Sequence, residues 1–402
     1  MTPRPPLRCD VAVVGAGVIG LASAWRLAQR GARVVVADPA PGSGASGVAA
    51  GMLAPVTEAR LGEEPLLRLN HASWARWPGF AAEVATAGGR SIGYRADGTL
   101  MVALDADDRA VLDDLASRHR AMGLEVEVLR GRQARALEPG LAPGTRAGLL
   151  AADERSVDPQ ALVGALQAAC EAARVELLVG SVERVVTTAG GDRVTGVEVA
   201  TAAGADGAPE MRVIEAGTVV LAAGCRSRDL PGLPAVARPP VRPVKGQVLT
   251  LRQPPGEALV TRTVRGIVRG SSIYLVPRDD GRVVVGATVE ERGWDIRATA
   301  GGAYELLRDA LALVPGLDDA ELVAVRAGSR PGSPDDLPMI GTSADGLVTA
   351  TGHHRNGILL TPITADAVAA IVAGEPAPDE VAPCDPRRFS SSGGPRPAAA
   401  RT

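Results

Sequence analysis

Residues 10–38 hold the feature that most restricts how this chain can fold. An apolar run at residues 10–14 leads into Gly15-Ala16-Gly17-Val18-Ile19-Gly20, and a helical pattern follows as far as Gln29. A second apolar run then ends at Asp38. This order of strand, glycine turn, helix, strand and acid is typical of the βαβ unit that binds the diphosphate of a dinucleotide. The unit does not distinguish NAD from FAD as the bound dinucleotide. Asp38 disfavours NADP, because its carboxylate would repel the additional phosphate.

The three glycines of this turn have different roles. Gly15 lets the chain turn sharply out of the strand, Gly17 lets the backbone approach a pyrophosphate, and Gly20 lets the helix pack close to the sheet. The helix should begin near Val18, so its free N–H groups and partial positive charge face the phosphates. Asp38 can accept hydrogen bonds from a ribose diol. The alternative is a glycine turn that binds nothing. With 48 glycines in the chain the motif alone is weak, and the flanking strands, helix and acid make it strong.

Composition excludes several classes of protein. The 402 residues suggest two domains, and 46% of them are hydrophobic, enough for a sizeable core. The net charge of −3 comes without a basic stripe, which argues against nucleic-acid binding. No apolar run reaches the roughly eighteen residues that span a membrane. The N-terminus lacks an apolar signal core, so we expect a soluble cytoplasmic protein. The cysteines are scattered, which argues against a disulfide framework and a metal site; they are Cys9, Cys170, Cys225 and Cys384.

A run of very small residues follows Asp38, at residues 41–55. Its second half contains Ala49-Ala50-Gly51-Met52-Leu53, which is too apolar for a solvated loop. Small residues suit backbone that packs tightly against a flat ligand. A flexible linker is the alternative on composition alone.

The hydrophobic periodicity predicts the remaining elements. Helices are expected over residues 65–87, 106–122, 159–174, 302–314 and from the turn at 352–357 to about 373, with Asp158 as the cap of the third. Strands are expected as a pair within 90–104 and over 124–129, 175–179, 193–199, 218–224, 244–251, 272–276, 282–288, 321–328 and 347–351. The turn Asp279-Asp280-Gly281 predicts a hairpin. Residues 131–148 read as a loop-rich stretch. Residues 218–224 are apolar throughout and are expected to return to the first parallel sheet.

The order of these elements predicts a discontinuous fold. Nucleotide-type strands occur near the start, the middle and the end of the chain, and antiparallel β segments lie between them. We therefore predict an α/β fold, α+β overall, in which a Rossmann-type domain carries an inserted, mostly antiparallel β-sheet substrate domain. The nucleotide-binding domain is assigned to residues 1–88, 151–235 and 329–385. The substrate domain is assigned to residues 89–150 and 236–328, and residues 386–402 to a disordered tail.

Several further motifs, in this order, resemble one known group of enzymes. They are Ala49-Ala50-Gly51-Met52-Leu53, Pro243-Val244-Lys245-Gly246-Gln247, Tyr274-Leu275-Val276-Pro277-Arg278, Val285-Gly286-Ala287-Thr288, Arg330-Pro331, Pro338-Met339-Ile340-Gly341 and Gly352-His353-His354-Arg355-Asn356-Gly357-Ile358. Together with the first βαβ unit they resemble the D-amino-acid oxidase superfamily of FAD-dependent oxidoreductases. Within it they resemble the glycine oxidases of the thiamine-biosynthesis type. The resemblance covers about residues 9–383.

The resemblance implies a non-covalently bound FAD, and no histidine or cysteine lies in a pattern that suggests a covalent link. The implied cofactor contacts are Gly15, Gly17, Val18, Ile19, Gly20, Asp38, Pro39, Ala45, Ser46, Ala50, Gly51, Met52, Val182, His353, His354, Arg355, Asn356, Gly357, Ile358 and Leu359. Val182 would meet adenine through its backbone, and residues 353–359 would lie beside the flavin ring. Asp38 stands where this group usually has glutamate, so its ribose contact would need a small shift or a water.

For the substrate, the resemblance implies Arg330, Arg355 and Tyr274. Arg330 would clamp a carboxylate by two parallel hydrogen bonds, and Tyr274 would donate its hydroxyl. The alternatives are a surface salt bridge for Arg330, core packing for Tyr274 and bracing of its own loop for Arg355. Lys245, the only lysine, could favour oxygen activation or pair with an acid, and the ion pair is the preferred interpretation. His353 and His354 are adjacent, which favours loop filling or flavin contact over metal binding.

The implied reaction moves a hydride from the α-carbon of an amino acid to flavin N5, with no acid–base side chain of the protein. Glycine, sarcosine or small D-amino acids would give an imine and then a 2-oxo acid and ammonia. Molecular oxygen would be reduced to hydrogen peroxide. A role in making the thiazole ring of thiamine is implied, and we expect a homo-oligomer, dimer or tetramer.

Four alternatives to this reaction stay open. Within enzymes they are a D-amino-acid or N-methyl amino-acid oxidase and a dehydrogenase that passes electrons to a partner. A non-catalytic flavin-binding protein and an NAD-dependent dehydrogenase are the others. The carboxylate clamp argues against a non-catalytic flavin-binding protein. The small-residue stretch and the loop at residues 352–357 argue against an NAD-dependent dehydrogenase.

Overall fold

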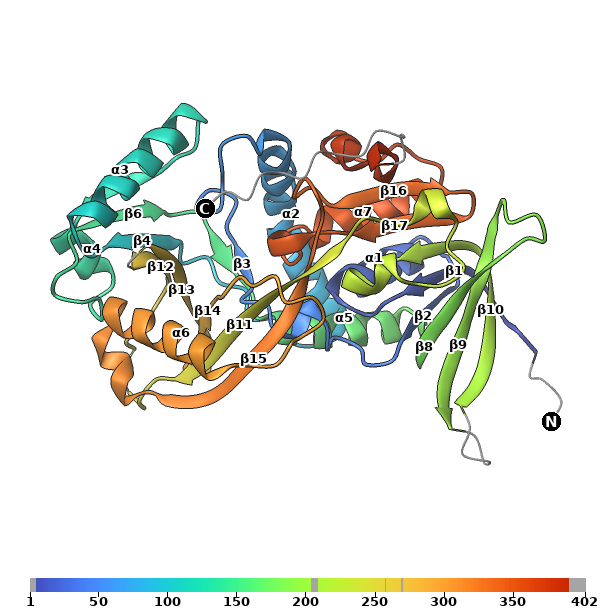
Figure 1. Ribbon diagram of the computed structural model, residues 1–402, viewed down its shortest axis with the longest axis horizontal. Coiled ribbons are helices and arrows are strands. Elements are labelled where there is room, and N and C mark those ends of the chain that lie inside the picture. The colour runs from blue at the N-terminus through green and yellow to red at the C-terminus, as the bar shows by residue number, and fades with distance from the viewer. Residues whose placement is uncertain (1–4, 204–208, 257, 269, 390–402) are drawn as a thin grey trace.

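The computed structural model describes residues 5–203, 209–256, 258–268 and 270–389 (Figure 1). The described residues contain two large β-sheets, one at each end of the long axis of the molecule, with helices packed against both (Figure 1). Among these residues no helix combines the length and the apolar character needed to cross a bilayer.

The first sheet is built from parallel strands of the start, middle and end of the chain. Its parallel strands, in spatial order, are β8 (Glu176–Thr187), β2 (Val34–Asp38), β1 (Leu7–Val14), β10 (Pro209–Leu221) and β17 (Leu347–Thr351). The edge strand β16 (Met339–Ala344) runs antiparallel to β17. Leu221 of β10 lies opposite Val14 of β1 in a parallel pair. The prediction that residues 218–224 return to the first sheet is therefore confirmed.

Both faces of this sheet are covered, as its unbroken apolar runs require. Four helices pack on the face that carries Val11 and Val13: α1 (Val18–Gln29), α2 (Glu64–Gly88), α5 (Pro159–Ala172) and α7 (Thr361–Val372). The opposite face, with Ala12 and Val14, packs against the antiparallel meander of β8, β9 (Val194–Ala203) and β10. The meander extends beyond the sheet at the right of Figure 1.

The second sheet has eight strands and is antiparallel except at one pair. Its order is β15 (Glu321–Gly332), β11 (Arg242–Arg252), β14 (Arg282–Gly286), β13 (Ser271–Pro277), β12 (Thr263–Val268), β4 (Thr99–Ala103), β6 (Ala147–Ala151) and β5 (Glu127–Arg130). Only β12 and β4 run parallel. Helix α6 (Ala300–Leu313) buries its apolar side on one face, while α3 (Ala106–Ala121) and α4 (Gly131–Leu137) pack near β4, β5 and β6.

Short elements connect these layers. The two-residue strands β3 (Met52–Leu53) and β7 (Arg155–Ser156) pair with each other. The 3-10 helices are η1 (Ala45–Gly47), η2 (Gly224–Arg228), η3 (Ala235–Ala237), η4 (Pro315–Asp319), η5 (His354–Asn356), η6 (Asp379–Cys384) and η7 (Pro386–Phe389).

Most predicted helices and strands are confirmed, including the cap at Asp158, whose side chain accepts from the backbone N–H groups of Gln160 and Ala161. The hairpin through Asp279-Asp280-Gly281 joins β13 to β14, also as predicted. Strands β12 and β16 were not foreseen. Each sheet contains strands from separate parts of the chain, as the predicted discontinuous fold requires. The domain limits themselves stay a prediction.

Three predictions are wrong. Residues 131–148 contain α4 and the first two residues of β6, so only residues 138–146 form the predicted loop. The glycine that opens α4 and the small residues of β6 hide both elements in the sequence. Within 90–104 only Thr99–Ala103 is a strand, and it pairs with β6 and β12 instead of a neighbouring segment. Residues 386–389 form η7 with Pro386 buried, so the tail is ordered as far as Phe389. The rest of the predicted disordered tail lies outside the described residues.

Candidate active site

The glycine turn between β1 and α1 is packed against backbone atoms. Gly15 has a φ of 105°, a left-handed conformation that side chains rarely adopt, and a Cβ there would overlap the carbonyl of Ala222, the residue that follows β10. A Cβ at Gly20 would overlap the Gly15 carbonyl oxygen. The predicted roles of Gly15 in the turn and Gly20 in the close approach of helix and sheet therefore match the geometry.

The N-terminus of α1 is suited to an anion. Gly17 is the N-cap in extended conformation, and the first turn of α1 contains no acidic residue. The backbone N–H of Val18 donates to Ser46 Oγ at 3.2 Å, which brings the buried Ser46 of η1 to the helix start. Free N–H groups and the helix dipole favour phosphate at such a position. The arrangement fits the diphosphate of a dinucleotide.

Asp38 ties the end of β2 to the glycine turn. Its Oδ2 accepts from the backbone N–H of Ala16 at 2.7 Å, and its Oδ1 accepts from that of Ala40 at 2.7 Å. A carboxylate has about four acceptor sites, so ribose hydroxyls can still bind it. Asp38 lies opposite Val179 of β8, and Val182 follows where β8 continues past the end of β2. Both residues therefore lie toward the carboxyl edge of the sheet, where α/β folds bind ligands. Pro39 follows directly and is exposed.

The small-residue stretch is packed between the two sheets, so the alternative of a flexible linker is wrong. Ala50 is buried, and its carbonyl accepts from Arg278 Nη2 at 2.6 Å. The Gly51 carbonyl accepts from the Val157 N–H, and Met52 pairs with Ser156 in β3. The side chains that pack here against the second sheet are those of Val48, Ala50, Met52, Val248, Tyr274, Val276, Val284 and Ala287. The stretch therefore lines one defined face of the second sheet.

The loop before α7 is held by buried contacts. His353 is buried with its Nε2 3.0 Å from Thr364 Oγ1, and burial lowers the pKa of this imidazole to about 3, so it is neutral. His354 Nδ1 lies 3.0 Å from Asp336 Oδ1. The carbonyl of Leu359 accepts from Ser73 Oγ and Trp77 Nε1 of α2. The two histidines thus have separate protein partners, in agreement with loop filling. Asn356, Ile358 and Leu359 are buried in the same loop, and Gly357 is half-buried.

Arg330 reaches across a neighbouring strand. It lies on β15 opposite Val244, and its guanidinium crosses β11 above Gly246, where a Cβ would overlap both terminal nitrogens. Its Nη1 donates to the Thr288 carbonyl oxygen at 3.2 Å. No acid among the described residues forms an ion pair with Arg330, so the alternative of a surface salt bridge does not hold there. The guanidinium keeps hydrogen-bonding capacity for a carboxylate.

Tyr274 lies on the same face of the sheet as Arg330. Tyr274 faces Gly286, Gly286 faces Val248, and Val248 faces Arg326, which is four residues before Arg330. Residues opposite each other in antiparallel strands share a face. A Cβ at Gly286 would overlap the Tyr274 ring and hydroxyl. Burial raises the pKa of the Tyr274 phenol, and the nearby Arg330 opposes this shift. This face is the one that packs against residues 48–52.

Arg355 is surrounded by acids. It forms an ion pair with Glu63, and it lies 3.8 Å from a carboxylate oxygen of Glu58 and of Asp336. Glu58 in turn pairs with Arg265 at 3.2 Å, and Arg265 lies opposite Tyr274 in the sheet. These contacts favour bracing of the loop by Arg355, and its contact with substrate stays a prediction.

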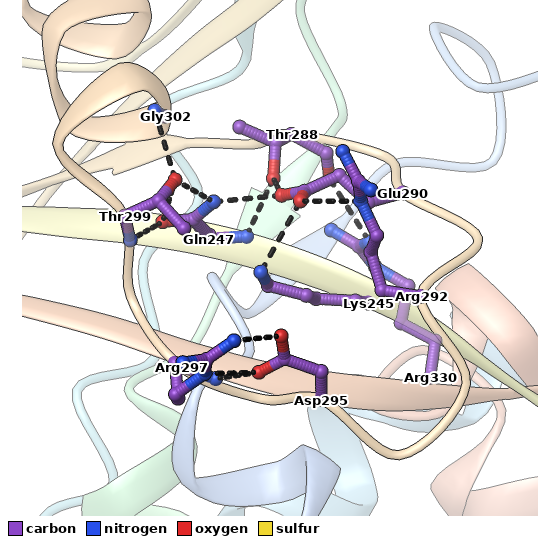
Figure 2. Close-up of polar contacts among 10 residues, drawn as sticks. All are labelled: Lys245, Gln247, Thr288, Glu290, Arg292, Asp295, Arg297, Thr299, Gly302 and Arg330. Carbon is purple, nitrogen blue, oxygen red and sulfur yellow. Dashed lines mark hydrogen bonds and ion pairs between the residues drawn. The ribbon is translucent and has the colours of Figure 1, made fainter.

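Lys245 lies on the other face of the second sheet. Gly246 faces Arg330, whereas the Gln247 side chain packs against Gly302 of α6, and Lys245 alternates with Gln247 on that face. Lys245 is 1% exposed, and its Nζ lies 3.2 Å from Glu290 Oε2 (Figure 2). The ion-pair interpretation is confirmed. Oxygen activation by Lys245 is not supported, because the strand separates it from the face of Arg330.

The structure adds residues that sequence reasoning missed. Gly246 and Gly286 make room for Arg330 and Tyr274, while Arg265, Arg278 and Glu58 fix the segment that carries residues 50–58. A glycine inside an apolar strand pattern often marks a close approach of another group, and this signal was available at both glycines. The arginine contacts depend on strand register, which the sequence does not show.

Known proteins are similar to this chain in sequence and in fold. Residues 10–371 match the DAO family, FAD dependent oxidoreductase. The crystal structure of glycine oxidase from Geobacillus kaustophilus matches with a TM-score of 0.82 and 32% identity, covering 94% of this chain and 98% of that one. The putative thiamine biosynthesis oxidoreductase ThiO of Rhizobium etli is 34% identical over 362 residues, 89% of this chain and 95% of that protein.

A longer relative matches over part of its length. The bifunctional protein ThiO/ThiG of Trichormus variabilis is 34% identical over 364 residues, which are 90% of this chain and 52% of that protein. The chain thus spans about half the length of the bifunctional relatives that it matches. The match of the family to nearly the whole chain agrees with the glycine turn, Asp38 and the packed small-residue stretch. This chain therefore belongs to the family of FAD-dependent oxidoreductases that includes D-amino-acid oxidase, and FAD is its cofactor.

Proposed function

We propose that this chain oxidises glycine, and also sarcosine and small D-amino acids. The amino acid loses two electrons and two protons to become an imine, which water converts to a 2-oxo acid and ammonia, with methylamine in place of ammonia when the substrate is sarcosine. Molecular oxygen takes up the two electrons and two protons and becomes hydrogen peroxide. The observation that carries the proposal is the pairing of Arg330 with Tyr274 on the sheet face that packs against residues 48–52. Relatives named glycine oxidase and ThiO support the same reaction.

The proposed task of the protein side chains is to hold the substrate. The Arg330 guanidinium binds the carboxylate through two parallel N–H groups, and Tyr274 donates its hydroxyl to the same carboxylate. Glycine, sarcosine and D-amino acids share this carboxylate beside the amine, so one clamp serves them all. With the carboxylate anchored on the sheet, the α-carbon and amine face the segment at residues 48–52.

The proposed cofactor contacts are the twenty residues named from the sequence. The start of α1 with Ser46 would hold the diphosphate, Asp38 the ribose and Val182 the adenine. Bound FAD supplies the two-electron oxidation. The loop at residues 353–359 would contact the flavin ring through its backbone, since its His353 side chain bonds to Thr364. Attachment is non-covalent in this proposal.

We further infer the setting in which the enzyme works. Its imine product would serve the synthesis of the thiamine thiazole, as suggested by relatives named ThiO and ThiO/ThiG. We place the enzyme in the cytoplasm and expect a homo-oligomer, dimer or tetramer. Size-exclusion chromatography with light scattering tests the oligomer, and a monomer would remove that part of the proposal.

The reaction is tested with the purified protein. It should be yellow, and glycine added without air should bleach the visible absorption of the oxidised flavin. Admission of air should restore the colour and release peroxide. A panel of glycine, sarcosine and D-amino acids, read by peroxide release, ranks the substrates. Bleaching without peroxide release would favour a dehydrogenase. A colourless protein that FAD does not reconstitute would contradict the proposal.

The carboxylate clamp is tested by comparing two arginine variants of the same strand, β15. Arg330→Ala should raise KM for glycine on the order of 100-fold, because a charged two-point contact is lost. Arg326→Ala is the matched control, since Arg326 lies on the same strand and is exposed. An unchanged KM in Arg330→Ala would remove Arg330 from the site.

A further inference from the structure

The position of Arg330 depends on one backbone carbonyl, that of Thr288. Arg330 Nη1 donates to it at 3.2 Å. Thr288 lies after the end of β14, in a segment that stays alongside β11. The Thr288 N–H donates to the Gln247 carbonyl at 3.3 Å, and the backbones of Lys245 and Glu290 exchange two hydrogen bonds of 2.9 Å each. The place of the Thr288 carbonyl is therefore set by what holds residues 287–290 against β11.

Glu290 is the centre of the polar group that holds this segment (Figure 2). Its Oε1 accepts from Gln247 Nε2 at 2.7 Å and from Thr288 Oγ1 at 2.7 Å. Its Oε2 lies 3.2 Å from Lys245 Nζ and 4.0 Å from Arg292 Nε. Thr288 Oγ1 also accepts from the backbone N–H of Gln247 at 2.9 Å. One carboxylate thus fixes the Thr288 side chain from the face of the sheet opposite to Arg330.

The same group extends to the start of α6. Gln247 Oε1 accepts from the Thr299 N–H at 2.7 Å, and Thr299 Oγ1 accepts from Gln247 Nε2 at 3.0 Å. The Thr299 hydroxyl oxygen caps α6 through the Gly302 N–H. The whole segment between β14 and α6 is therefore anchored at both ends to one glutamine of β11 (Figure 2).

The charges in this group are balanced. Lys245 is 1% exposed, while the Glu290 side chain is 20% exposed. Burial works against ionisation of Glu290, but hydrogen bonds from Gln247 and Thr288 and the charge of Lys245 outweigh it, so its pKa lies below the usual range. A buried lysine without its acid would be strongly unfavourable. The buried Lys245 therefore requires the charge of Glu290.

We propose that Glu290 is a positioning residue for Arg330: it fixes Thr288 across β11, the Thr288 carbonyl orients the guanidinium, and Lys245 balances the charge of Glu290. This inference rests on the proposed function, because it assigns the group to the carboxylate clamp. Neither Glu290 nor Lys245 contacts the substrate. The link to the substrate side passes through the backbone of residues 287–290.

Thr288 provides the sharpest test, because its side chain can be changed without changing its shape. Thr288→Val removes the hydroxyl that bonds to Glu290 and to the Gln247 N–H. It should raise the dissociation constant of acetate, read from the change in flavin absorption of the holoenzyme, about tenfold. KM for glycine should rise by a similar factor, with kcat changed less than about twofold. Thr288→Ser keeps the hydroxyl and should restore both values to within about twofold of the wild type.

The ion pair is tested by three variants. Glu290→Gln removes the charge and weakens the hold on Thr288, so acetate affinity should fall about tenfold. Lys245→Met leaves both Oε1 contacts of Glu290 in place, so acetate affinity should fall only about twofold. Should Glu290→Gln fail to fold because Lys245 loses its partner, the double variant Lys245→Met/Glu290→Gln removes both charges and should fold. It should still bind acetate about tenfold more weakly.

Asp295→Asn is the control on the same segment. Asp295 pairs with the 86% exposed Arg297 and makes no contact with Glu290 among the described residues (Figure 2). The acetate affinity of Asp295→Asn should match that of the wild type. Equal losses in Thr288→Val and Thr288→Ser, or none in either, would overturn the positioning role while leaving the proposed reaction intact. Wild-type holoenzyme that binds neither acetate nor glycine would overturn both.

Discussion

Glycines shape two regions of the molecule: the glycine turn beside the first sheet and the Arg330–Tyr274 face of the second sheet. The two regions differ in which atoms fill the space that a Cβ would need. At Gly15 and Gly20 these atoms belong to the backbone. At Gly246 and Gly286 they belong to the ends of Arg330 and Tyr274. Backbone cannot move aside, whereas a side-chain tip can. The comparison teaches that the first pair is required for the fold, and the second pair for the position of the two side chains that we propose bind the substrate.

Gly20→Ala should have the largest effect. The added Cβ would meet the Gly15 carbonyl, so α1 or the glycine turn must move, at a cost of about 3 kcal/mol or more. We expect little soluble holoprotein, measured as yield, FAD content and melting temperature. Gly79→Ala in α2 is the control, because no described heavy atom lies within 4 Å of its Cβ position. It should stabilise by about 0.5–1 kcal/mol. Normal FAD content in Gly20→Ala would break the comparison.

Gly246→Ala should weaken acetate binding while it leaves the stability of the fold nearly unchanged. The added Cβ would displace the Arg330 guanidinium, which can swing away, so the melting temperature should change by only a few degrees, or about 1 kcal/mol. Acetate affinity of the FAD-bound protein should fall about 10- to 100-fold. Gly301→Ala in α6 is a control with open space around its Cβ position among the described residues. A large loss of stability with unchanged acetate affinity would contradict the distinction between the two pairs.

Gly286→Ala should have a smaller effect, because Tyr274 supplies one neutral hydrogen bond. Both Gly286→Ala and Tyr274→Phe should weaken acetate binding about five- to tenfold. If Gly286 acts by placing the Tyr274 hydroxyl, the two effects should not add in the double variant. The affinities are read from the flavin spectrum of all four proteins. Additive losses would show that Gly286 serves another purpose.

His353 should give the smallest effect. Burial lowers the pKa of its imidazole to about 3, whereas in the unfolded chain the ordinary value is about 6.5. The unfolded chain therefore binds a proton first as the pH falls. The stability from this group is present above about pH 6.5 and is lost as the pH falls toward 3. Between about pH 7 and 5.5 the wild type should lose about 1 kcal/mol more than His353→Gln in urea unfolding. Parallel pH profiles would contradict a neutral buried His353.

The first sheet was predictable because its signals are local. Glycine turn, helix start and terminal acid lie within residues 15–38, and the structure brings them together as expected. The same holds for the cap at Asp158 and the hairpin at residues 279–281. Each depends on contacts among residues close in sequence, where residue type and spacing carry the information.

The second sheet was predictable only in outline. Its antiparallel character follows from its turns, but the order β12-β4-β6 joins strands far apart in the chain. Arg265 lies opposite Tyr274, and Lys245 lies on the reverse face from Arg330, because of strand registers that no local pattern specifies. A shift of one residue would exchange the two faces. The partners of Lys245, Glu290 and Gly246 therefore became clear only from the structure.

The position of β17 has a consequence for how the protein is made. Strand β17 completes the nucleotide sheet by pairing with β10, yet it ends only at Thr351. At about 5–20 residues per second, a ribosome needs on the order of ten seconds to go from the end of β10 at Leu221 to this strand. During that time β10 has an unpaired edge, and the loop at residues 353–359 does not yet exist. With the proposed contact of residues 353–359 to the flavin, cofactor capture requires that residues 1–359 have been made, and a nascent chain that stops before β17 exposes an open sheet edge.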